Sequence, residues 1–269
     1  MNDTNDMDTL TYSAIKTFRN CRRMYDLRYN RCLVPVEEDE TKRLGSVFHT
    51  CMEMWYLSAC NAQAGGREAG VPAGLVIDAV NDYIDRSYPD RLVDDVQRKS
   101  WHLARAMFRA YAERYPSEDF EVVAVEKEFR CPIVNPDTGC SNRTFLMSGK
   151  VDAVIIIDGQ YYILEHKTAA NISSDYIERL PMDFQVTLYS DYIGQEMNLK
   201  IAGIVYNVVG KAMLKQGKGE TEEEFQERRA ALIAKSKTGK SSAKRKIPEP
   251  DDAFQERLAE KYRDDGMFH

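Results

Sequence analysis

The sequence predicts an α/β (α+β) fold, with a central mixed β-sheet flanked by helices and preceded by a helical N-terminal region. Between about residues 11 and 115, apolar side chains recur every three or four positions, as in amphipathic helices. From about residue 119 to 210, apolar and polar residues alternate in the way that is typical of strands. We expect residues 1–210 to form one domain and residues 211–269 to form a helical C-terminal extension with a basic linker.

The composition excludes several classes of protein. No apolar run of the 269 residues approaches the roughly 18–20 needed to cross a bilayer, and the N-terminus does not resemble a signal peptide. We therefore expect a globular, cytoplasmic protein without a membrane partner. The six cysteines show no CxxC spacing, which argues against a zinc ribbon or a disulfide framework. A net charge of −6 argues against a protein that coats nucleic acid, yet it permits a local basic track.

The first predicted helix is basic. Ser13 can cap a helix that runs to about Tyr29, with apolar residues on one face. Its cations could contact nucleic-acid phosphates, or they could form an ordinary solvated face, and the pattern alone leaves both interpretations open. The candidate nucleic-acid-binding residues are Lys16, Arg19, Arg22 and Arg23.

A second helix is expected to begin at Gly45 and to carry His49 on its half-buried stripe. A histidine in such a place is either a satisfied core residue or a ligand, and its position does not decide between them. Two further helices are expected near residues 74–87 and 92–115. The turn residues Asn135 to Gly139 then separate two strands, and this makes Cys131 and Cys140 loop cysteines.

The most informative segment is a predicted β-hairpin around Asp158-Gly159. This dipeptide lies between β-branched and aromatic runs and indicates a two-residue turn. The register then follows: residue 157 faces 160 and, further along, Asp152 faces Glu165. Facing residues point to the same side of a sheet, and the strand period of two adds Lys167 to that side. Because the remaining hairpin positions are nearly all apolar, we expect both faces to be covered.

Two carboxylates in such a place require compensation. Like charges directly opposite each other destabilise a sheet, and taking each charge out of water costs several kcal/mol. A divalent cation would compensate, so the hairpin predicts a metal site. The alternative is a cross-strand ion-pair cluster of Asp152, Glu165 and Lys167 at the end of a surface hairpin.

The rest of the chain adds a helix, a strand and the extension. Residues 181–197 are expected to be helical, with Gln185 and Tyr189 on one face, and residues 201–209 to form a buried strand. A helix near 220–236, a linker at 237–250 and a last helix from Asp251 follow. The linker cations could follow a phosphate backbone or belong to a solvated linker. The chain ends without a polar tail, which is typical of a fragment.

With these motifs in place, the sequence resembles the PD-(D/E)xK nuclease superfamily, and within it the RecB-type branch of phage exonucleases and CRISPR adaptation nucleases. The resemblance spans residues 11 to about 210 and implies a restriction-endonuclease-like core. It rests on five motifs in family order: Ser13-x-Ile15-x-x-Phe18-x-x-Cys21 with Tyr25, Gly45-x-x-x-His49 with Glu53, Gly149-x-Val151-Asp152, Glu165-x-Lys167, and Gln185-x-x-x-Tyr189.

The resemblance assigns roles residue by residue. It implies that His49, Asp152, Glu165 and the backbone carbonyl of His166 bind Mg²⁺ or Mn²⁺. Lys167 would be the catalytic lysine, with Gln185 and Tyr189 close by. Val151 replaces the proline before the first acid, which changes no ligand. No cysteine follows Cys140, so we expect no iron–sulfur cluster, and we expect Cys21 to pack as a small hydrophobic residue.

The function that these residues indicate is a metal-dependent DNA nuclease. The cation would polarise the scissile phosphate and an attacking water, and Lys167 would orient that water or stabilise the developing charge. The resemblance implies an exonuclease that leaves 5′-phosphates in phage or bacterial DNA recombination, repair or replication, with a helicase or annealing partner. The alternative is an inactive nuclease fold that binds nucleic acid or a partner. A nucleotide-handling enzyme is disfavoured, because the chain lacks the GxxxxGK[ST] loop.

Overall fold

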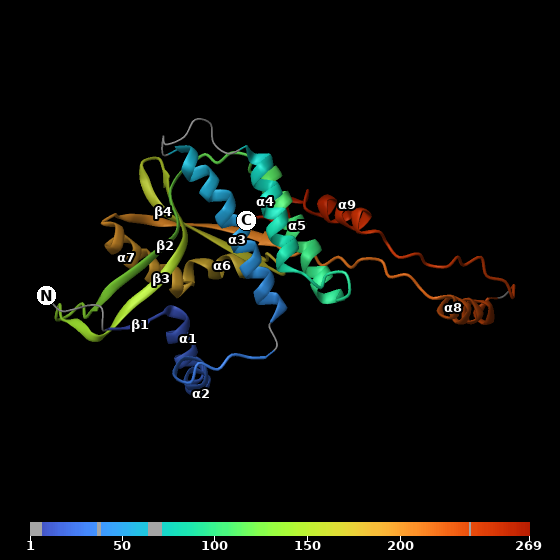
Figure 1. The fold of residues 1–269 in the computed structure, drawn as a ribbon, viewed down its shortest axis with the longest axis horizontal. Helices are drawn as coiled ribbons and strands as arrows, with labels where there is room; N and C mark the ends of the chain where they lie inside the picture. Colours follow the sequence, from blue (N-terminus) through green and yellow to red (C-terminus); the bar gives the residue numbers. More distant parts are fainter. Residues whose placement is uncertain (1–6, 37–38, 64–71, 237) are drawn as a thin grey trace.

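The fold is a mixed β-sheet with helices on both faces, as the sequence predicts (Figure 1). The computed structural model describes residues 7–36, 39–63, 72–236 and 238–269. The strands are β1 (Asp8–Leu10), β2 (Glu121–Val134), β3 (Ser141–Ile157), β4 (Gln160–Ala169) and β5 (Ile201–Gly210). The helices are α1 (Tyr12–Asn20), α2 (Arg22–Tyr25), η2 (Asp26–Asn30), α3 (Glu40–Gln63), α4 (Ala73–Ser87), α5 (Asp95–Arg114), α6 (Ser174–Arg179), η3 (Leu180–Met182), α7 (Phe184–Met197), α8 (Glu222–Lys235), α9 (Asp251–Lys261) and η4 (Asp265–Met267).

Strand β3 is the centre of the sheet. Strand β2 runs antiparallel along one edge of β3 for nearly its whole length. The other edge is shared, because β1 pairs in parallel with residues 145–147 and β4 pairs antiparallel with residues 153–157. The stretch of β3 between these two partners therefore forms the inside of a fork. Strand β5 continues the sheet by pairing in parallel with β4.

The hairpin between β3 and β4 has the predicted register. Ile157 pairs with Gln160, and the ladder continues to Ala153 and Leu164. Asp158 and Gly159 have φ values of 50° and 75°, which are the left-handed values of a type I′ turn. The ladder between β3 and β4 ends at the pair Ala153 and Leu164. Asp152 and Glu165 therefore stand one residue beyond it, where β3 and β4 separate.

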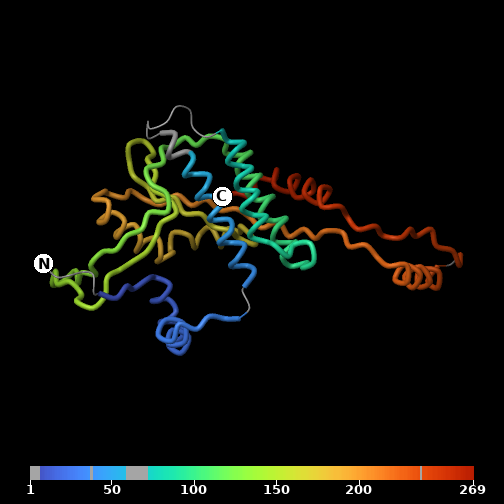
Figure 2. The backbone as a smooth tube through the Cα atoms, viewed as in Figure 1, coloured from blue at the N-terminus to red at the C-terminus, as the bar shows by residue number. Residues whose placement is uncertain are grey.

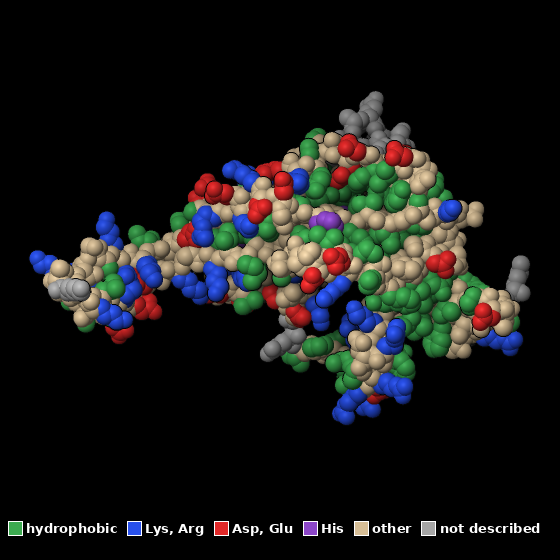
Figure 3. Space-filling model, turned by 180° about the vertical axis from the view of Figure 1, so that it is seen from behind, with side chains coloured by type: hydrophobic (Ala, Val, Ile, Leu, Met, Phe, Trp, Pro, Cys, Tyr) green, Lys and Arg blue, Asp and Glu red, His purple; other side chains and the backbone are tan. Residues whose placement is uncertain are grey.

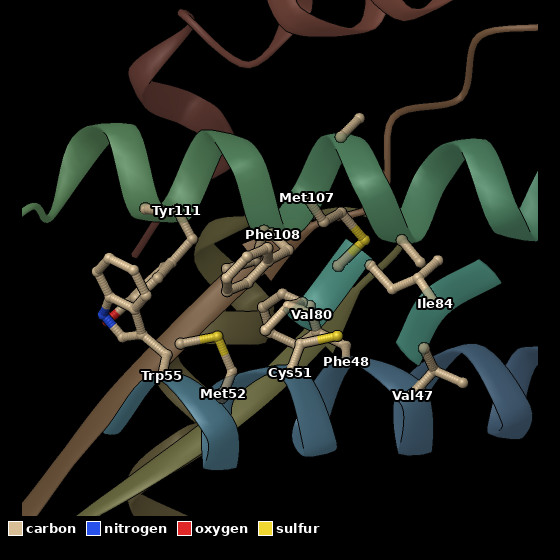
Figure 4. Close-up of a cluster of buried hydrophobic side chains, with 14 of the residues drawn as sticks. Val47, Phe48, Cys51, Met52, Trp55, Val80, Ile84, Met107, Phe108 and Tyr111 are labelled. Atoms are coloured by element: carbon tan, nitrogen blue, oxygen red, sulfur yellow. The ribbon is translucent and has the colours of Figure 1, made fainter. Parts of the chain in front are cut away.

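The sheet is covered on both faces, as expected for this hairpin. Ala153, Ile155 and Leu164 belong to a large core built with α3, α4, α5 and α9. Figure 4 shows the helical part of this core, in which side chains of α3 interlock with those of α4 and α5. The alternate strand residues Val154 and Ile163 belong to a second core, which α7 covers.

The N-terminal helix differs from the prediction. It is capped by Thr11 rather than Ser13, and it ends at Asn20 instead of continuing to Tyr29. Cys21 interrupts it in an extended conformation, with φ −158° and ψ 105°, and its Sγ accepts a hydrogen bond from the N–H of Met24. The expectation that Cys21 packs as a small hydrophobic residue is wrong, because its side chain is exposed and caps α2.

Two smaller expectations are also corrected. Helix α3 begins at Glu40 rather than at Gly45, so the glycine lies inside the helix. Cys131 is not a loop cysteine, because it lies buried in β2, and its thiol donates to the carbonyl of Tyr192. The helices α4 and α5 and the strand β5 lie where the sequence predicts them.

The segment after β5 consists of a projecting arm and a returning end. The described residues between 211 and 250 form this arm, which runs out from the core and back, with α8 at the far end (Figure 2). Backbone hydrogen bonds from Glu220 to Lys246 and from Glu249 to Gly217 hold the two segments together. The returning end packs Phe254, Leu258 and Tyr262 into the main core, and Phe268 bridges to β5. Among the described helices, none is both long and apolar enough to span a membrane.

His166 anchors β4 from the face opposite to Glu165 and Lys167. Its side chain is 2% exposed and stacks on Tyr56 of α3 with ring centroids 5.3 Å apart. The amide of Asn207 on β5 donates to its Nδ1 at 2.7 Å. Burial lowers the pKa of this imidazole to about 4, although the charge of Asp152 opposes the shift.

We expect the Gly149→Ala variant to unfold more readily than the wild type. A Cβ at this position would lie 2.5 Å from Cζ of Phe129 and 2.8 Å from Cζ of Tyr189, so two buried rings would have to move. Such overpacking costs about 1–3 kcal/mol. The control is Gly74→Ala at the exposed start of α4, where a Cβ meets nothing within 4 Å and the free energy of unfolding should stay equal or rise. Urea unfolding that shows equal stabilities for both variants would contradict this packing.

The second prediction concerns pH. The unfolded chain titrates His166 near about pH 6.5, whereas the folded imidazole has a pKa of about 4. Between these two pH values the unfolded state therefore binds more protons than the folded state. The contribution of His166 to the free energy of unfolding is complete above about pH 6.5 and falls as the pH drops towards 4. The loss should reach about 3 kcal/mol. Urea unfolding of wild type and His166→Gln across this range should give a flatter pH profile for the variant. Parallel profiles would contradict it.

Candidate active site

Asp152 lies at the fork between β3 and β4, and both of its carboxylate oxygens are engaged. Oδ1 lies 3.2 Å from Nδ1 of His49, and Oδ2 accepts the backbone N–H of His166 at 2.7 Å. Burial opposes ionisation of Asp152, but the hydrogen bond and charge of His49, together with the backbone N–H of His166, outweigh it. They hold the pKa of Asp152 below its ordinary value.

His49 reaches the fork from α3. Its neighbours Phe48 and Met52 are fully buried and fix this face of the helix against the sheet. Burial lowers the pKa of His49, but the hydrogen bond and the charge of Asp152 reverse the effect, so the net shift is upward. The structure thus brings together two residues that are 103 positions apart in the sequence.

Glu165 and Lys167 lie on β4 and point to the same face, as the strand period requires. Nζ of Lys167 lies 2.7 Å from Oε1 of Glu165 and 3.5 Å from Oδ2 of Asp183. Burial raises the pKa of Glu165, and the charge of Asp152 raises it further. Burial alone would lower the pKa of Lys167, yet Glu165 and Asp183 hold it above its ordinary value. Lys167 is therefore an ammonium group.

The two acids consequently differ in their readiness to ionise. Asp152 is stabilised as an anion, whereas Glu165 resists a second negative charge beside it. Within the described residues, no three His, Cys, Asp or Glu side chains form a ready metal cage. The carboxylate oxygens of Asp152 and Glu165 are instead occupied by contacts with His49, Lys167 and the backbone N–H of His166. A divalent cation would have to displace some of these contacts, and it would remove the repulsion between the acids.

The two residues of the last motif lie on α7. Tyr189 is buried, its ring centroid is 5.1 Å from that of Phe129, and burial together with the charge of Glu165 raises its pKa. Gln185 stands one turn earlier and is half-buried, and its backbone N–H donates to Asp183. The structure therefore places Tyr189 near Glu165, and it places Gln185 in the first turn of the same helix.

Sequence reasoning missed Asp183, which both caps α7 and contacts Lys167. Its Oδ1 accepts from the N–H of Gln185 at 3.0 Å, while Oδ2 faces the ammonium of Lys167. The signal was present, because Asp is a preferred N-cap residue and stands at the start of a predicted helix. Its second contact, from the start of α7 to Lys167 on β4, could not be predicted from local sequence.

A second missed group lies on the β2 side of Asp152. Val125 and Lys127 pair with Ala153 and Val151, so Glu126 faces Asp152 across the ladder. Glu126 has a φ of 51°, which is unusual for a residue with a side chain, and it forms an ion pair with Lys150. No pattern in the sequence predicts this, because the register shifts between Val122 and Ala124.

The predicted nucleic-acid-binding cations lie on α1 and α2. Lys16, Arg19, Arg22 and Arg23 are all exposed there. Figure 3 shows Lys and Arg side chains gathered on this projection, at the bottom of the view. The projection meets the core beside α7, where the rings of Tyr12 and Phe184 lie 6.1 Å apart. The cations are therefore separate from the carboxylates but flank the same end of α7.

Comparison with known proteins agrees with this geometry. The sequence model of the PD-(D/E)XK nuclease superfamily matches residues 9–265. This span includes most of β1 and the whole of the fork, α7, the arm and α9. No curated protein matches the chain. Because the family match covers nearly the whole chain and the site is built at the expected motifs, this protein belongs to the PD-(D/E)XK nuclease superfamily.

Proposed function

We propose that the protein is a metal-dependent DNA nuclease that hydrolyses phosphodiester bonds. The observation that carries this proposal is the arrangement at the fork, where Asp152 meets His49 and where Glu165 and Lys167 follow on the adjacent strand. Burying two neighbouring acids costs several kcal/mol unless opposite charges or hydrogen bonds compensate, so their presence together favours a functional site. Clustered titratable groups with shifted pKa values are also a feature of active sites.

Asp152, Glu165, His49 and the backbone carbonyl of His166 would hold Mg²⁺ or Mn²⁺. The carboxylates and the carbonyl suit either ion, and the imidazole favours Mn²⁺. The N–H of His166 points at Asp152, and the N–H and C=O of one strand residue share an edge, so the carbonyl faces the same side. When bound, the cation would polarise the scissile phosphate and activate water.

Lys167 would stabilise negative charge on the phosphate. Glu165 and Asp183 keep its pKa above the ordinary value, so the side chain serves as a fixed cation and not as a general base. A group of this kind is most effective when it is held rigidly, and two carboxylates hold this ammonium in place. Asp183 would therefore be a positioning residue for Lys167.

The finer role follows the family resemblance. We propose an exonuclease that leaves 5′-phosphates on DNA and acts in recombination, repair or replication in a phage or bacterium. A helicase or annealing protein would supply the DNA end. Exposed cations on α1 and α2 support a nucleic-acid substrate, because they add local positive charge to a chain with a net charge of −6.

The catalytic proposal predicts that Lys167→Ala loses at least about 100-fold in cleavage rate, because it removes a charge that contacts the reacting phosphate. The control is Lys200→Ala, which removes an exposed lysine just before β5. The measurement is digestion of end-labelled linear and circular DNA, single- and double-stranded, with Mg²⁺, Mn²⁺ or EDTA. Loss of linear DNA with circles spared would identify an exonuclease.

Two outcomes would count against the proposal. If Lys167→Ala and Asp152→Ala cleave as fast as the wild type, the activity does not arise from this site. If the wild type binds DNA but cleaves nothing with any cation, the alternative of an inactive binding module is the better interpretation.

The metal ligands give a separate prediction. Mn²⁺ should raise the melting temperature of the wild type, because a ligand that binds only the folded state stabilises it. His49→Ala should weaken Mn²⁺ binding by at least about tenfold and Mg²⁺ binding by less. Asp152→Asn should abolish both effects, whereas Asp137→Asn, in the exposed turn between β2 and β3, should change neither. A thermal shift titration checks this, and an unchanged Mn²⁺ response of Asp152→Asn would contradict it.

A further inference from the structure

The N-terminal projection, formed by α1, α2 and η2, carries a row of aromatic rings on its surface. The centroids of Phe18 and Tyr25 lie 5.2 Å apart in an edge-on arrangement, and those of Tyr25 and Tyr29 lie 5.1 Å apart. The side chain of Phe18 is 46% exposed. We call Phe18, Tyr25 and Tyr29 the aromatic row.

The aromatic row does not belong to the protein core. In the described part of the chain, the core cluster beneath α7 takes Tyr12 and Ile15 from this projection, at the end of α1 that meets the body. The rings further along contact one another and their own cations instead. Phe18 is exposed and Tyr25 and Tyr29 are half-buried, and aromatic side chains that gather at the surface outside the core indicate a binding surface.

Cations alternate with the rings. Arg22 lies over the ring of Phe18 at 5.4 Å, and Arg28 lies over that of Tyr29 at 5.6 Å. Lys16 is similarly placed at 5.7 Å from Tyr12. Asp26, the acid within α1 to η2, is paired with Arg31 at 2.8 Å. The surface is therefore aromatic and positively charged, which complements a ligand that presents flat rings and phosphates.

We propose that the aromatic row is a stacking site for unpaired bases of single-stranded DNA. Proteins that hold single strands combine basic tracks with aromatic side chains on which bases stack. The bases of a duplex are already stacked and paired inside the helix, so they cannot use such a surface. This inference rests on the proposed nuclease function and adds a substrate class to it: DNA with an unpaired end or strand.

The position of the row suits delivery to the fork. Tyr12, the first residue of α1, contacts Phe184 of α7. Asp183, which directly precedes Phe184 in the chain, contacts Lys167. From Tyr12 to Phe18 the helix rises about 9 Å. This corresponds to roughly three bases at 3.4 Å per nucleotide. A strand stacked on the row could therefore follow α1 towards Phe184 and the proposed catalytic lysine.

Binding in EDTA tests the proposal without requiring catalysis. The probes are a fluorescent oligothymidylate of about 20 nucleotides, longer than known stacking sites of this type, and a duplex of equal length. Fluorescence anisotropy should show about 5- to 100-fold weaker oligothymidylate binding by Phe18→Ala and Phe18→Leu. Phe18→Tyr should bind like the wild type because it restores the ring, and duplex binding should change less than about twofold.

The Leu and Tyr variants separate stacking from packing, since both preserve apolar bulk in α1. Leu75→Ala is the control, because it removes an exposed apolar side chain from α4. Equal binding of single strands by Phe18→Leu and the wild type would overturn the proposal. Equal losses of affinity for duplex and for single strands would overturn it as well, because a change in charge or in folding would affect both probes alike.

Photocrosslinking gives an independent readout. An oligonucleotide that carries 5-iododeoxyuridine should crosslink to the peptide that contains the aromatic row, and mass spectrometry identifies the attached residue. Crosslinks confined to the arm at 211–250 would overturn the proposal. Because both experiments run in EDTA, failure of the stacking site and failure of the nuclease activity are measured separately.

Discussion

The buried carboxylate of Asp152 is the constraint on which the site depends. A charge removed from water costs several kcal/mol unless it is compensated by hydrogen bonds and opposite charge. The compensation comes from His49 on one helix and from the backbone N–H of His166 on the neighbouring strand. Helix α3 must therefore bring His49 to the end of the β3–β4 ladder, and β4 must separate from β3 at this residue. A misplacement of either element would leave the charge unpaired.

Much of this arrangement could be predicted, because its information is local. The Asp158-Gly159 turn sets the hairpin register, and the register brings Asp152 and Glu165 to the same end of the ladder. The point where the ladder ends could not be predicted from the hairpin alone, nor could the pairing of β1 with β3 beyond the fork, because β1 lies more than 130 residues earlier in the chain. The break at Cys21 was missed for a different reason: helical periodicity continues through it, and only the backbone geometry reveals the second cap.

Side-chain contacts between distant elements set the second limit. Sequence periodicity predicts that α9 is a helix, but not that Phe254 and Leu258 pack into the same core as α5. The contact of Asp183 with Lys167 and the pairing of Glu126 with Lys150 are of the same kind. In each case the local pattern indicates the element and its exposed or buried face. The partner is decided by the topology of the sheet, which a single sequence specifies only indirectly.

The alternation of β4 explains how the fold holds the residues of the candidate site in place. Glu165 and Lys167 point to one face, and the residue between them points to the other, where His166 is locked by Tyr56 and Asn207. The reactive side chains are thus fixed through the backbone by an imidazole that is buried in the core. Since a displacement of about 1 Å can cost a catalytic group much of its effect, this anchoring would matter to the proposed roles of Glu165 and Lys167. The neutral state of His166 follows from the same burial, because an imidazolium ion in the core would lose its hydration.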